Sequence, residues 1–454
     1  MNKEKYNLLT KTAQKFCKYL DSDIYYIFQA NIPRYHNVYL KDYKILNKNN
    51  FVFYSQVFFK IFKNIFQRII QMLRGIFVKK NIFETLKVKN VFVSHNFKQD
   101  NNFTDLYFSN FFKKKNIVDN SSVFIFNHSN KILESKNCNN FYINNISNFK
   151  DEIKIFLNQL RIFVKILNFK TVDQYEYKFK FFILTDLFSL ETKKNFLFQL
   201  YLKRFLKKNK PKNLITPYEG QSYEKVALNK ENYLDHKITS YGFVRTPMYK
   251  NHHFFFEPVN LKYYPDNIIT AYKCDLFEKT IDVGSNYFSL EKVKNKFSSN
   301  IILLCPEGLV DETKNFIDLA KRDKNKKFKF IFRIHPILKN KLNLFNLPAN
   351  IEISNKSLND DLYEATYCIY RGTSVSYNCV ASYVYPLYYD YSIFDVNSLE
   401  QFGNNFHYSK FQNFNDLQDI LSMISDLEKK LEYNYDKSKI FFSKFDENKI
   451  NFLN

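Results

Sequence analysis

Tryptophan is absent from this chain, and glycine is scarce, with only 7 residues in 454. The sequence also has no Walker loop, no GxGxxG, no GxSxG and no HExxH. The first two motifs supply glycines that let backbone amides approach phosphates, and the last two supply a nucleophile or zinc ligands. Their absence excludes the commonest nucleotide-binding, hydrolase and zinc-protease classes.

Cysteine is sparse as well. The six cysteines are widely separated and form no CxxC pair. This spacing argues against a zinc site or a disulfide framework and favours a reducing compartment. The first 20 residues are too polar for a signal peptide, and no run of 18 uncharged apolar residues occurs. We expect a cytoplasmic protein, free or peripheral on the inner face of the cytoplasmic membrane.

Positive charge and aromatic residues are abundant. Lysine and arginine number 68 against 45 acidic residues, which gives a net charge of +23, and aromatic residues make up 19%. The charge favours anionic partners such as phosphates or an acidic membrane face. Nucleic acid is disfavoured, because the lysines are spread along the chain rather than gathered in one basic arm. The length exceeds what one hydrophobic core supports, so two main domains are expected.

One stretch has a clear helical period. From Phe58 to Phe77, apolar residues recur three or four positions apart, and basic and amide residues fill the other face without an acidic residue. This pattern predicts an amphipathic helix with a cationic face. It fits either an interfacial helix, with residues 55–78 on an anionic membrane surface, or a surface helix packed on its own domain.

Further along, short apolar strands alternate with helical segments in two series. Such alternation predicts parallel sheets covered by helices. We predict an α/β fold with two Rossmann-like domains facing across a cleft, preceded by a mostly helical N-terminal extension. The predicted divisions are an N-terminal region at 1–87, a first domain at 88–258, a second domain at 259–425 and a helical tail at 426–454. One long helix is expected from Asn413 to Tyr433, and we find no internal repeat.

The stretch from Phe328 to Pro336 alternates apolar and basic residues and reads as a strand. The proline forbids helical continuation, so the strand should stop and turn there. Arg333 and His335 would then lie at the carboxyl end of a strand, where open α/β sheets bind ligands. His335 is a candidate donor to a departing phosphate oxygen, with Arg333 adding positive charge. The alternative is a structural histidine that turns the chain.

A second polar cluster, Arg371-Gly372-Thr373-Ser374, comes between a strand and a helix. Amides at a helix N-terminus converge on an anion, and glycine lets the backbone approach it closely. The alternative is ordinary capping of the helix by Thr373 or Ser374. Two further strand-end loops, with Gly284 and Ser285 in one and Glu307 in the other, are expected at the same edge. Together these loops predict a phosphate pocket.

The first domain offers carboxylates instead. Glu219 follows a strand and suits a general base that deprotonates an acceptor hydroxyl. Glu224 lies at the start of the next helix and is expected to bond backbone amides there, while His95 on an earlier loop is a lesser candidate. Asp360 and Asp361 read as helix caps rather than a metal-binding pair. No metal ion is required by this pattern.

These residues resemble a known group. The segment from Tyr218 to Glu224, YEGQSYE, is similar to the Y-E-x-Q-x-W-E segment of bacterial surface-carbohydrate biosynthesis proteins with the two-Rossmann GT-B architecture. Pro265-Asp266-x-Ile268, Val283-Gly284-Ser285, His335-Pro336 and Thr373-Ser374 follow in that group's order. The resemblance covers roughly residues 88–425. It extends more distantly to bacterial sialyltransferases and Kdo transferases.

The resemblance implies a metal-independent glycosyltransferase with the acceptor in the first domain and a nucleotide-sugar donor, of the CMP-linked nonulosonate or Kdo type, in the second. The acceptor would be a surface polysaccharide or glycolipid, and the donor is a substrate rather than a cofactor. His335 and Pro336 would face the nucleotide phosphate, together with Thr373 and Ser374. Arg245 stands near where that group has a histidine, so it would bind an anionic acceptor.

Other functions fit the same sequence. Within enzymes these are a polyol-phosphate transferase of the CDP-glycerol type and a two-Rossmann nucleotide-sugar epimerase. Outside enzymes, a peripheral membrane protein that binds anionic glycolipid without catalysis remains open.

Overall fold

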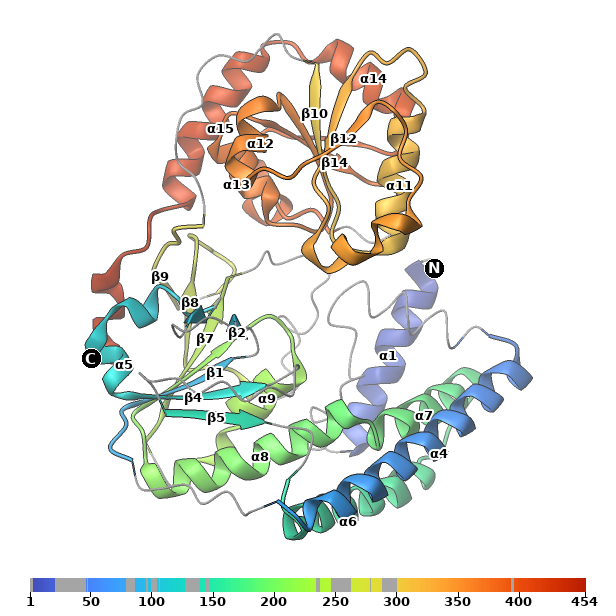
Figure 1. Cartoon of the computed structure of the whole chain (residues 1–454), viewed down its shortest axis with the longest axis vertical. Helices are drawn as coiled ribbons and strands as arrows, with labels where there is room; N and C mark the ends of the chain where they lie inside the picture. The colour runs from blue at the N-terminus through green and yellow to red at the C-terminus, as the bar shows by residue number, and fades with distance from the viewer. Residues whose placement is uncertain are drawn as a thin grey trace. The chain divides into compact units, whose positions relative to one another are not determined.

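The computed structural model describes residues 3–20, 46, 48–78, 86–94, 97–98, 104–105, 107–126, 139–143, 147–233, 237–245, 263–277, 279–287, 300–392 and 396–454. The chain divides into two compact units (Figure 1). Unit 1 extends to Ile269 and also takes Glu447–Asn454, whereas unit 2 comprises the described part of Thr270–Asp446. The predicted division at 258–259 and the linker expected at 252–260 lie outside the described residues.

The seven-stranded sheet has the strand order β5-β4-β1-β6-β7-β8-β9, and all of its strands lie in unit 1 except β9 and the last residue of β8. Its strands are β1 (Asn90–Ser94), β4 (Ser121–Phe126), β5 (Asn139–Ile143), β6 (Asn213–Pro217), β7 (Thr239–Val244), β8 (Asn267–Thr270) and β9 (Thr280–Asp282). The pairs from β5 to β7 are parallel. The first six strands follow the Rossmann order 3-2-1-4-5-6, in which the order reverses between β1 and β6. Two short strands, β2 (Phe97–Lys98) and β3 (Thr104–Asp105), form an antiparallel pair apart from this sheet.

A group of helices accompanies this sheet. They are α1 (Lys3–Leu20), α4 (Asn50–Gly75), α5 (Lys115–Asp119), α6 (Phe149–Leu167), α7 (Gln174–Leu187), α8 (Leu190–Asn209) and α9 (Ser222–Leu228), with 3-10 turns η1 (Phe111–Lys113) and η2 (Lys230–Asn232). Helix α4 packs against α6 and α7. The described part of the N-terminal region, residues 3–20 and 48–78 above all, is therefore mostly helical, as predicted.

Unit 2 contains a six-stranded sheet in the order β12-β11-β10-β13-β14-β15. Its strands are β10 (Ile301–Cys305), β11 (Lys329–Phe332), β12 (Ile351–Ile353), β13 (Tyr367–Tyr370), β14 (Tyr385–Tyr389) and β15 (Ser409–Phe411). All five pairs are parallel. This is again the order 3-2-1-4-5-6, and it reverses between β10 and β13.

The helices of unit 2 connect these strands. They are α11 (Val310–Lys321), α12 (Leu358–Glu364), α13 (Val375–Ala381), α14 (Phe414–Met423) and α15 (Leu427–Phe441), with 3-10 segments η4 (Pro336–Leu344) and η5 (Glu400–Asn405).

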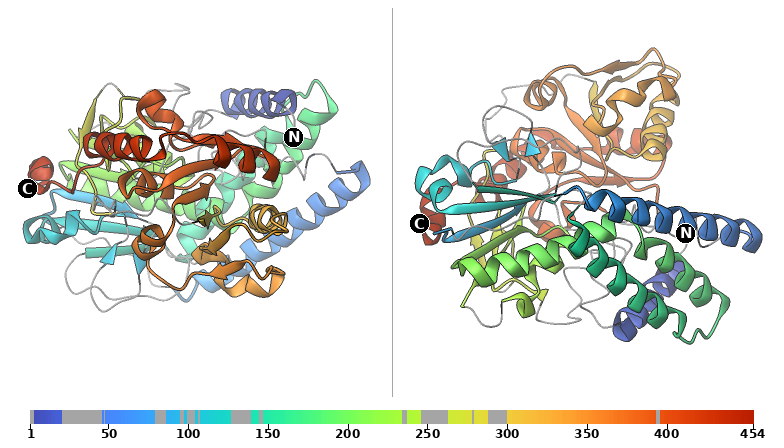
Figure 2. Two further views of the ribbon diagram at one scale, coloured as in Figure 1. Left: turned by 90° about the horizontal axis from the view of Figure 1, so that it is seen from above. Right: turned by 60° about the horizontal axis from the view of Figure 1, so that its bottom comes forward.

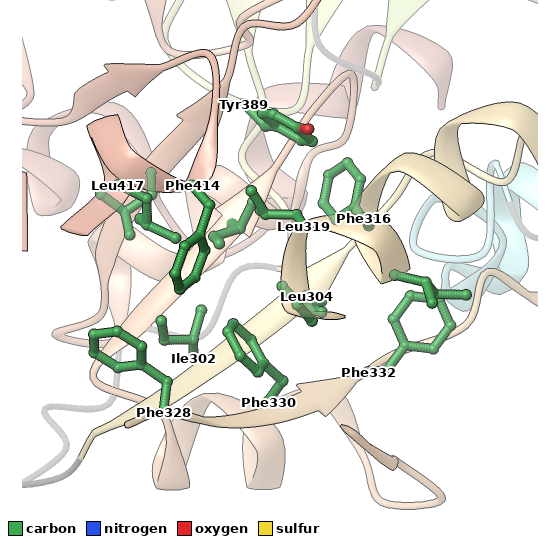
Figure 3. Packing of buried hydrophobic residues seen from close by; sticks show 14 of the residues in the cluster. Ile302, Leu304, Phe316, Leu319, Phe328, Phe330, Phe332, Tyr389, Phe414 and Leu417 are labelled. Atoms are coloured by element: carbon green, nitrogen blue, oxygen red, sulfur yellow. The ribbon is translucent and has the colours of Figure 1, made fainter. Parts of the chain in front are cut away.

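Alternation along β11 builds the core on one face of this sheet. Phe328, Phe330 and Phe332 point to the same side and are at most 5% exposed. They join Ile302 and Leu304 of β10 in a cluster that includes residues of α11 and α14 (Figure 3). Successive strand residues face opposite sides of a sheet, so this period-2 pattern fixes the orientation of β11. The strand predicted here is confirmed.

The C-terminal part differs from the expected single tail. The helix predicted from Asn413 to Tyr433 is broken into α14 and α15 at Asp426, which has a positive φ of 51°. A left-handed residue cannot continue a right-handed helix. Helix α15 packs on α13 in unit 2, whereas the 3-10 segment η6 (Glu447–Leu453) belongs to unit 1.

The fold class predicted from sequence, two Rossmann-like α/β units with a helical N-terminal extension, is confirmed by the two sheet orders. The cleft between the units remains a prediction.

Candidate functional site

The loops after β10, β11 and β13 lie next to one another in unit 2. These strands are adjacent and parallel, so their carboxyl ends share one edge of the sheet. The loop after β10 carries Glu307, the loop after β11 carries His335, and the loop after β13 carries Gly372 and Thr373. The reversal of strand order between β10 and β13 leaves an open position at this edge, where ligands bind in doubly wound sheets.

Two glycines let these loops touch. A Cβ atom on Gly308 would lie 2.7 Å from Cγ of His335, and one on Gly372 would lie 2.7 Å from Cδ of Glu307. Both glycines have positive φ, 91° and 59°, a region that side chains other than glycine rarely adopt. The ring of His335 therefore packs on Gly308, and the carboxylate of Glu307 packs on Gly372. We refer to the loops bearing Glu307, His335 and Gly372 as the unit 2 loop cluster.

His335 is held in its neutral form at neutral pH. Partial burial of the ring lowers its pKa below the usual value, and the nearby Glu307 carboxylate acts in the opposite direction. A neutral imidazole keeps one N–H donor and one acceptor nitrogen. The side chain is exposed and Pro336 beside it is exposed too, so the ring is accessible to a ligand.

The helix start after β13 leaves its hydroxyls largely accessible. Ser374 is the N-cap of α13 but makes no side-chain cap bond, and Oγ1 of Thr373 accepts a long bond of 3.3 Å from the Val375 amide. Both residues are partly exposed. Capping by Ser374, one of the alternatives to ligand binding, is therefore not what the structure shows.

Both predicted arginines donate hydrogen bonds to acceptors in unit 2. Arg371 is 1% exposed, and its Nη1 donates to the Tyr388 hydroxyl and the Tyr389 carbonyl, each at 3.2 Å. Arg333 donates from Nη1 to Asp361 at 2.7 Å and to the Lys356 carbonyl at 3.0 Å. Arg371 is thus buried within unit 2, whereas Arg333 is 33% exposed. That these guanidinium groups bind phosphate stays a prediction.

The loop with Gly284 and Ser285 packs against the segment after α15. A Cβ on Gly284 would lie 2.6 Å from Oγ of Ser443, and the Ser285 amide donates to the Ser443 carbonyl at 2.9 Å. Glycine with φ of 74° is needed here because another segment of the backbone passes close by. These two residues hold the segment after α15, and their part in a phosphate pocket stays a prediction.

In unit 1, the loop after β6 lies beside the strand-order reversal and carries Glu219. This residue is 4% exposed, and the hydroxyl of Tyr107 donates to its carboxylate. The guanidinium of Arg245 lies 5.8 Å from the centre of the Tyr107 ring. Glu219, Tyr107 and Arg245 therefore form one connected group, while His95 lies outside the described residues.

Glu224 organises this loop, as expected. Its Oε2 accepts three backbone amides, from Glu219 at 2.9 Å, Gly220 at 2.8 Å and Gln221 at 2.9 Å. Burial, and secondarily the charge of Glu219, raise the pKa of Glu224 to about 8. Lys225 beside it is fully buried, and burial lowers its pKa to about 7.

The same device occurs in unit 2, which the sequence analysis missed. Glu307-Gly308-x-x-x-Glu312 repeats the pattern Glu219-Gly220-x-x-x-Glu224. The Glu307 amide donates to Glu312 at 2.6 Å. Burial and the charge of Glu307 raise the pKa of Glu312 to about 8 as well. Both glycines have similar positive φ, 95° and 91°. The first copy follows β6, the fourth strand of the Rossmann order, and the second follows β10, the first strand of that order. Each copy therefore lies beside the strand-order reversal of its own sheet, on opposite sides of it.

Three contributing residues were not predicted: Tyr107, Lys225 and Glu312. Tyr107 lies in a turn, and no motif around it signals its contact with Glu219. Glu312 was detectable, because the E-G-x-x-x-E spacing occurs twice directly after a strand. The motif residue Asp266 proves structural, since its carboxylate accepts from the amide and hydroxyl of Ser240.

Two absences concern the described part of the chain. There, no three His, Cys, Asp or Glu side chains are placed to hold a metal ion. No described helix combines the length and the apolar composition needed to cross a bilayer.

Comparison with known proteins gives only distant structural likeness. No family model matches the chain, and no curated protein matches it. The calicheamicin glycosyltransferase shares 10% identity over 78% of this chain and 94% of its own, with a TM-score of 0.43. The glycosyltransferase SnogD from Streptomyces nogalater shares 10% over 81% and 99%, with a TM-score of 0.43. A UDP-GlcNAc 2-epimerase from Methanocaldococcus jannaschii shares 11% over 74% and 93%, with a TM-score of 0.40.

Likeness at TM-scores of 0.40 to 0.43 carries no conclusion about this chain. The fold assignment therefore rests on the two sheets of this chain, which both have the Rossmann strand order. In each unit, a loop at the edge where the strand order reverses is held by a buried glutamate.

Proposed function

We propose that this protein is a glycosyltransferase that moves a sugar from a nucleotide-activated donor to a surface-polysaccharide or glycolipid acceptor. The observation that carries the proposal is the unit 2 loop cluster, in which His335 and Glu307 are pressed against glycines beside the strand-order reversal. Such positions bind nucleotides in doubly wound folds. The donor would be of the CMP-linked nonulosonate or Kdo type, at the inner face of the cytoplasmic membrane.

The leaving phosphate would be met mainly by neutral donors. His335 in its neutral form offers an N–H group, and Thr373 and Ser374 offer hydroxyls and the amides that follow them. Hydrogen bonds aimed at developing charge stabilise the transition state without a metal ion. In this proposal Arg333 and Arg371 position the loops, because their guanidinium groups bond Asp361 and the Tyr389 carbonyl.

Glu219 would act as the general base toward an acceptor hydroxyl. The Tyr107 hydroxyl orients its carboxylate, and Glu224 fixes the backbone that carries it. Arg245, close to Tyr107, would attract an acceptor that carries negative charge.

Thermal-shift measurements with CMP, CDP, UDP and GDP test donor binding. One nucleotide should raise the melting temperature by mass action, and no response to any of them would refute the donor site. His335→Ala should abolish the shift and lower turnover by about a hundredfold. His407→Ala is the matched control, because His407 precedes β15 and so lies toward the opposite edge of the sheet.

Product analysis separates the other candidates. Sugar transfer that persists in EDTA supports the proposal. Phosphate retained in the product indicates a polyol-phosphate transferase, and turnover without an acceptor indicates an epimerase. Nucleotide binding without any turnover would leave a non-catalytic binding protein and would contradict the proposal.

A further inference from the structure

Helix α4 turns its apolar face outward. Phe59, Phe62 and Phe66 are 72%, 69% and 65% exposed. The stripe continues at helical spacing through three more exposed apolar residues, Ile69, Leu73 and Ile76. A soluble surface helix normally buries its apolar residues and exposes its polar ones, whereas α4 exposes this whole apolar stripe.

The inward face of α4 is apolar in its first half, at Phe53, Val57 and Ile61, and polar in its second half, at Asn64, Arg68 and Gln71. Asn64 donates to the Thr185 carbonyl at 2.7 Å, and Arg68 donates to Glu152 at 2.8 Å. Arg68 is fully buried, so it does not belong to the exposed cationic face expected from the sequence. These contacts fix the rotation of the helix, so the apolar stripe cannot turn inward without breaking a buried ion pair.

Helix α6 extends the apolar surface. It packs against α4, and the two helices run along the same side of the helical layer in Figures 1 and 2. Six apolar side chains on α6 are between 36% and 56% exposed, again at helical spacing: Phe149, Ile153, Leu157, Leu160, Val164 and Leu167. Exposed apolar side chains gathered on two helices that pack together are typical of interaction sites.

The charge of this surface has one sign. Both helices are described in full, and their exposed charged side chains are Lys60, Lys63, Arg74, Lys150, Lys154 and Arg161. The only carboxylates on the two helices, Asp151 and Glu152, are buried. Asp151 pairs with Arg204, and Glu152 pairs with Arg68 and Lys193. The surface formed by α4 and α6 therefore exposes cations and apolar groups but no carboxylate.

We propose that the surface formed by α4 and α6 docks on a lipid bilayer with anionic headgroups. The phenylalanine and aliphatic side chains would enter the boundary between headgroups and acyl chains, and the flanking lysines and arginines would contact lipid phosphates. A second copy of the chain is a poorer occupant, because two cationic faces repel. This inference stands independently of the proposed glycosyl transfer.

Vesicle co-sedimentation of the full chain tests the surface. Wild-type protein should bind vesicles of phosphatidylcholine with phosphatidylglycerol and bind pure phosphatidylcholine much more weakly. Phe62→Ser with Phe66→Ser should weaken binding to the anionic vesicles by about tenfold or more. The fold should survive, because both side chains are already exposed, and circular dichroism checks this. Lys60→Gln with Lys63→Gln should weaken binding only to anionic vesicles.

The matched control changes exposed apolar residues in unit 2. Met423 and Ile440 are 76% and 56% exposed, and Met423→Ser with Ile440→Ser should bind vesicles like wild type. Equal binding by the Phe62/Phe66 variant overturns the proposal, as does a wild-type protein that fails to bind. Loss of dimers in that variant, with vesicle binding unchanged, would assign the surface to a second copy instead.

Discussion

At the scale of single residues, the notable feature is a buried glutamate that holds a loop. Glu224 and Glu312 each accept the backbone amide of a glutamate five positions earlier. Burial disfavours the charged form, and the neighbouring carboxylate adds to this effect, so both pKa values rise to about 8. Each loop thus carries a group that gains or loses a proton near neutral pH.

This proton has a consequence for stability. The folded-state pKa of Glu224 exceeds the usual 4.5, so between these values the folded protein binds more protons, and the free energy of unfolding falls as pH rises. Glu224→Gln removes this group but keeps a carbonyl acceptor. From about pH 5 to about pH 8 the free energy of unfolding should fall in both proteins. The fall should be smaller in Glu224→Gln than in wild type, by at least about 1 kcal/mol.

Urea unfolding at the two pH values measures this difference. Glu312→Gln in unit 2 should show the same smaller fall in unfolding free energy, because the pKa of Glu312 is also raised to about 8. Glu432→Gln, at an exposed position, should follow wild type. An identical pH profile in all four proteins would contradict the prediction.

Gly308 offers a second residue-scale prediction. Gly308→Ala would strain a backbone with φ of 91° and push a methyl group against the His335 ring. Gly403→Ala is the control, since its φ is 57° but a Cβ there meets nothing within 4 Å. Each change should cost about 1 kcal/mol of unfolding free energy. Only Gly308→Ala should also weaken nucleotide binding, by about tenfold or more. Equal nucleotide binding by both variants would show that His335 does not contribute to the nucleotide site.

At the scale of elements, α4 shows that amphipathicity does not by itself say which face is buried. The periodicity predicted the helix correctly, but the structure exposes an apolar stripe and buries the polar residues Asn64, Arg68 and Gln71. A buried guanidinium makes this possible, because Arg68 is paired with Glu152 and Gln71, while Lys193 also pairs with Glu152.

Arg68→Met should therefore destabilise unit 1 strongly. The change leaves the fully buried Glu152 with Lys193 as its remaining cation, and breaking a buried pair from one side costs about 3 kcal/mol. Arg74→Met, on the exposed face of the same helix, should change stability by less than about 0.5 kcal/mol. Urea midpoints followed by circular dichroism would show the contrast, and equal midpoints would refute the role of the buried pair.

At the scale of the whole molecule, the chain returns to unit 1 at its end. Ile450 and Leu453 are fully buried, and the Leu453 carbonyl accepts from Asn90 of β1 at 2.8 Å. The Phe452 ring stacks on Tyr241 of β7 at 4.7 Å. The last residues thus form part of the unit 1 core rather than a free tail.

Ile450→Ala should weaken unit 1 selectively. Removing a buried isoleucine side chain costs about 2–5 kcal/mol. Hydrogen exchange should accelerate in β1 and β6 while β10 and β13 keep their protection, since Ile450 belongs to unit 1. Glu447→Ala, which truncates an exposed side chain in the same segment, is the control. Equal acceleration in both units would contradict the assignment of this segment.

The sequence determined the features that depend on local period. Alternation along Phe328–Phe332 predicted β11, and the proline after His335 predicted where the chain turns. Strand and helix alternation predicted two parallel sheets. These patterns are readable because side-chain direction repeats every two residues in a strand and every 3.6 in a helix.

Only the tertiary structure decided which groups meet. Arg333 and Arg371 follow strand ends, as predicted, and the structure shows that Arg333 bonds Asp361 and that Arg371 bonds the Tyr388 hydroxyl and the Tyr389 carbonyl. Tyr107 reaches Glu219 from a position 112 residues earlier. The local spacing of residues does not say which acceptor a buried arginine will bond. It also does not say which distant segments will come into contact. The sequence therefore set the elements and candidate loops, and long-range packing selected the residues left facing the site.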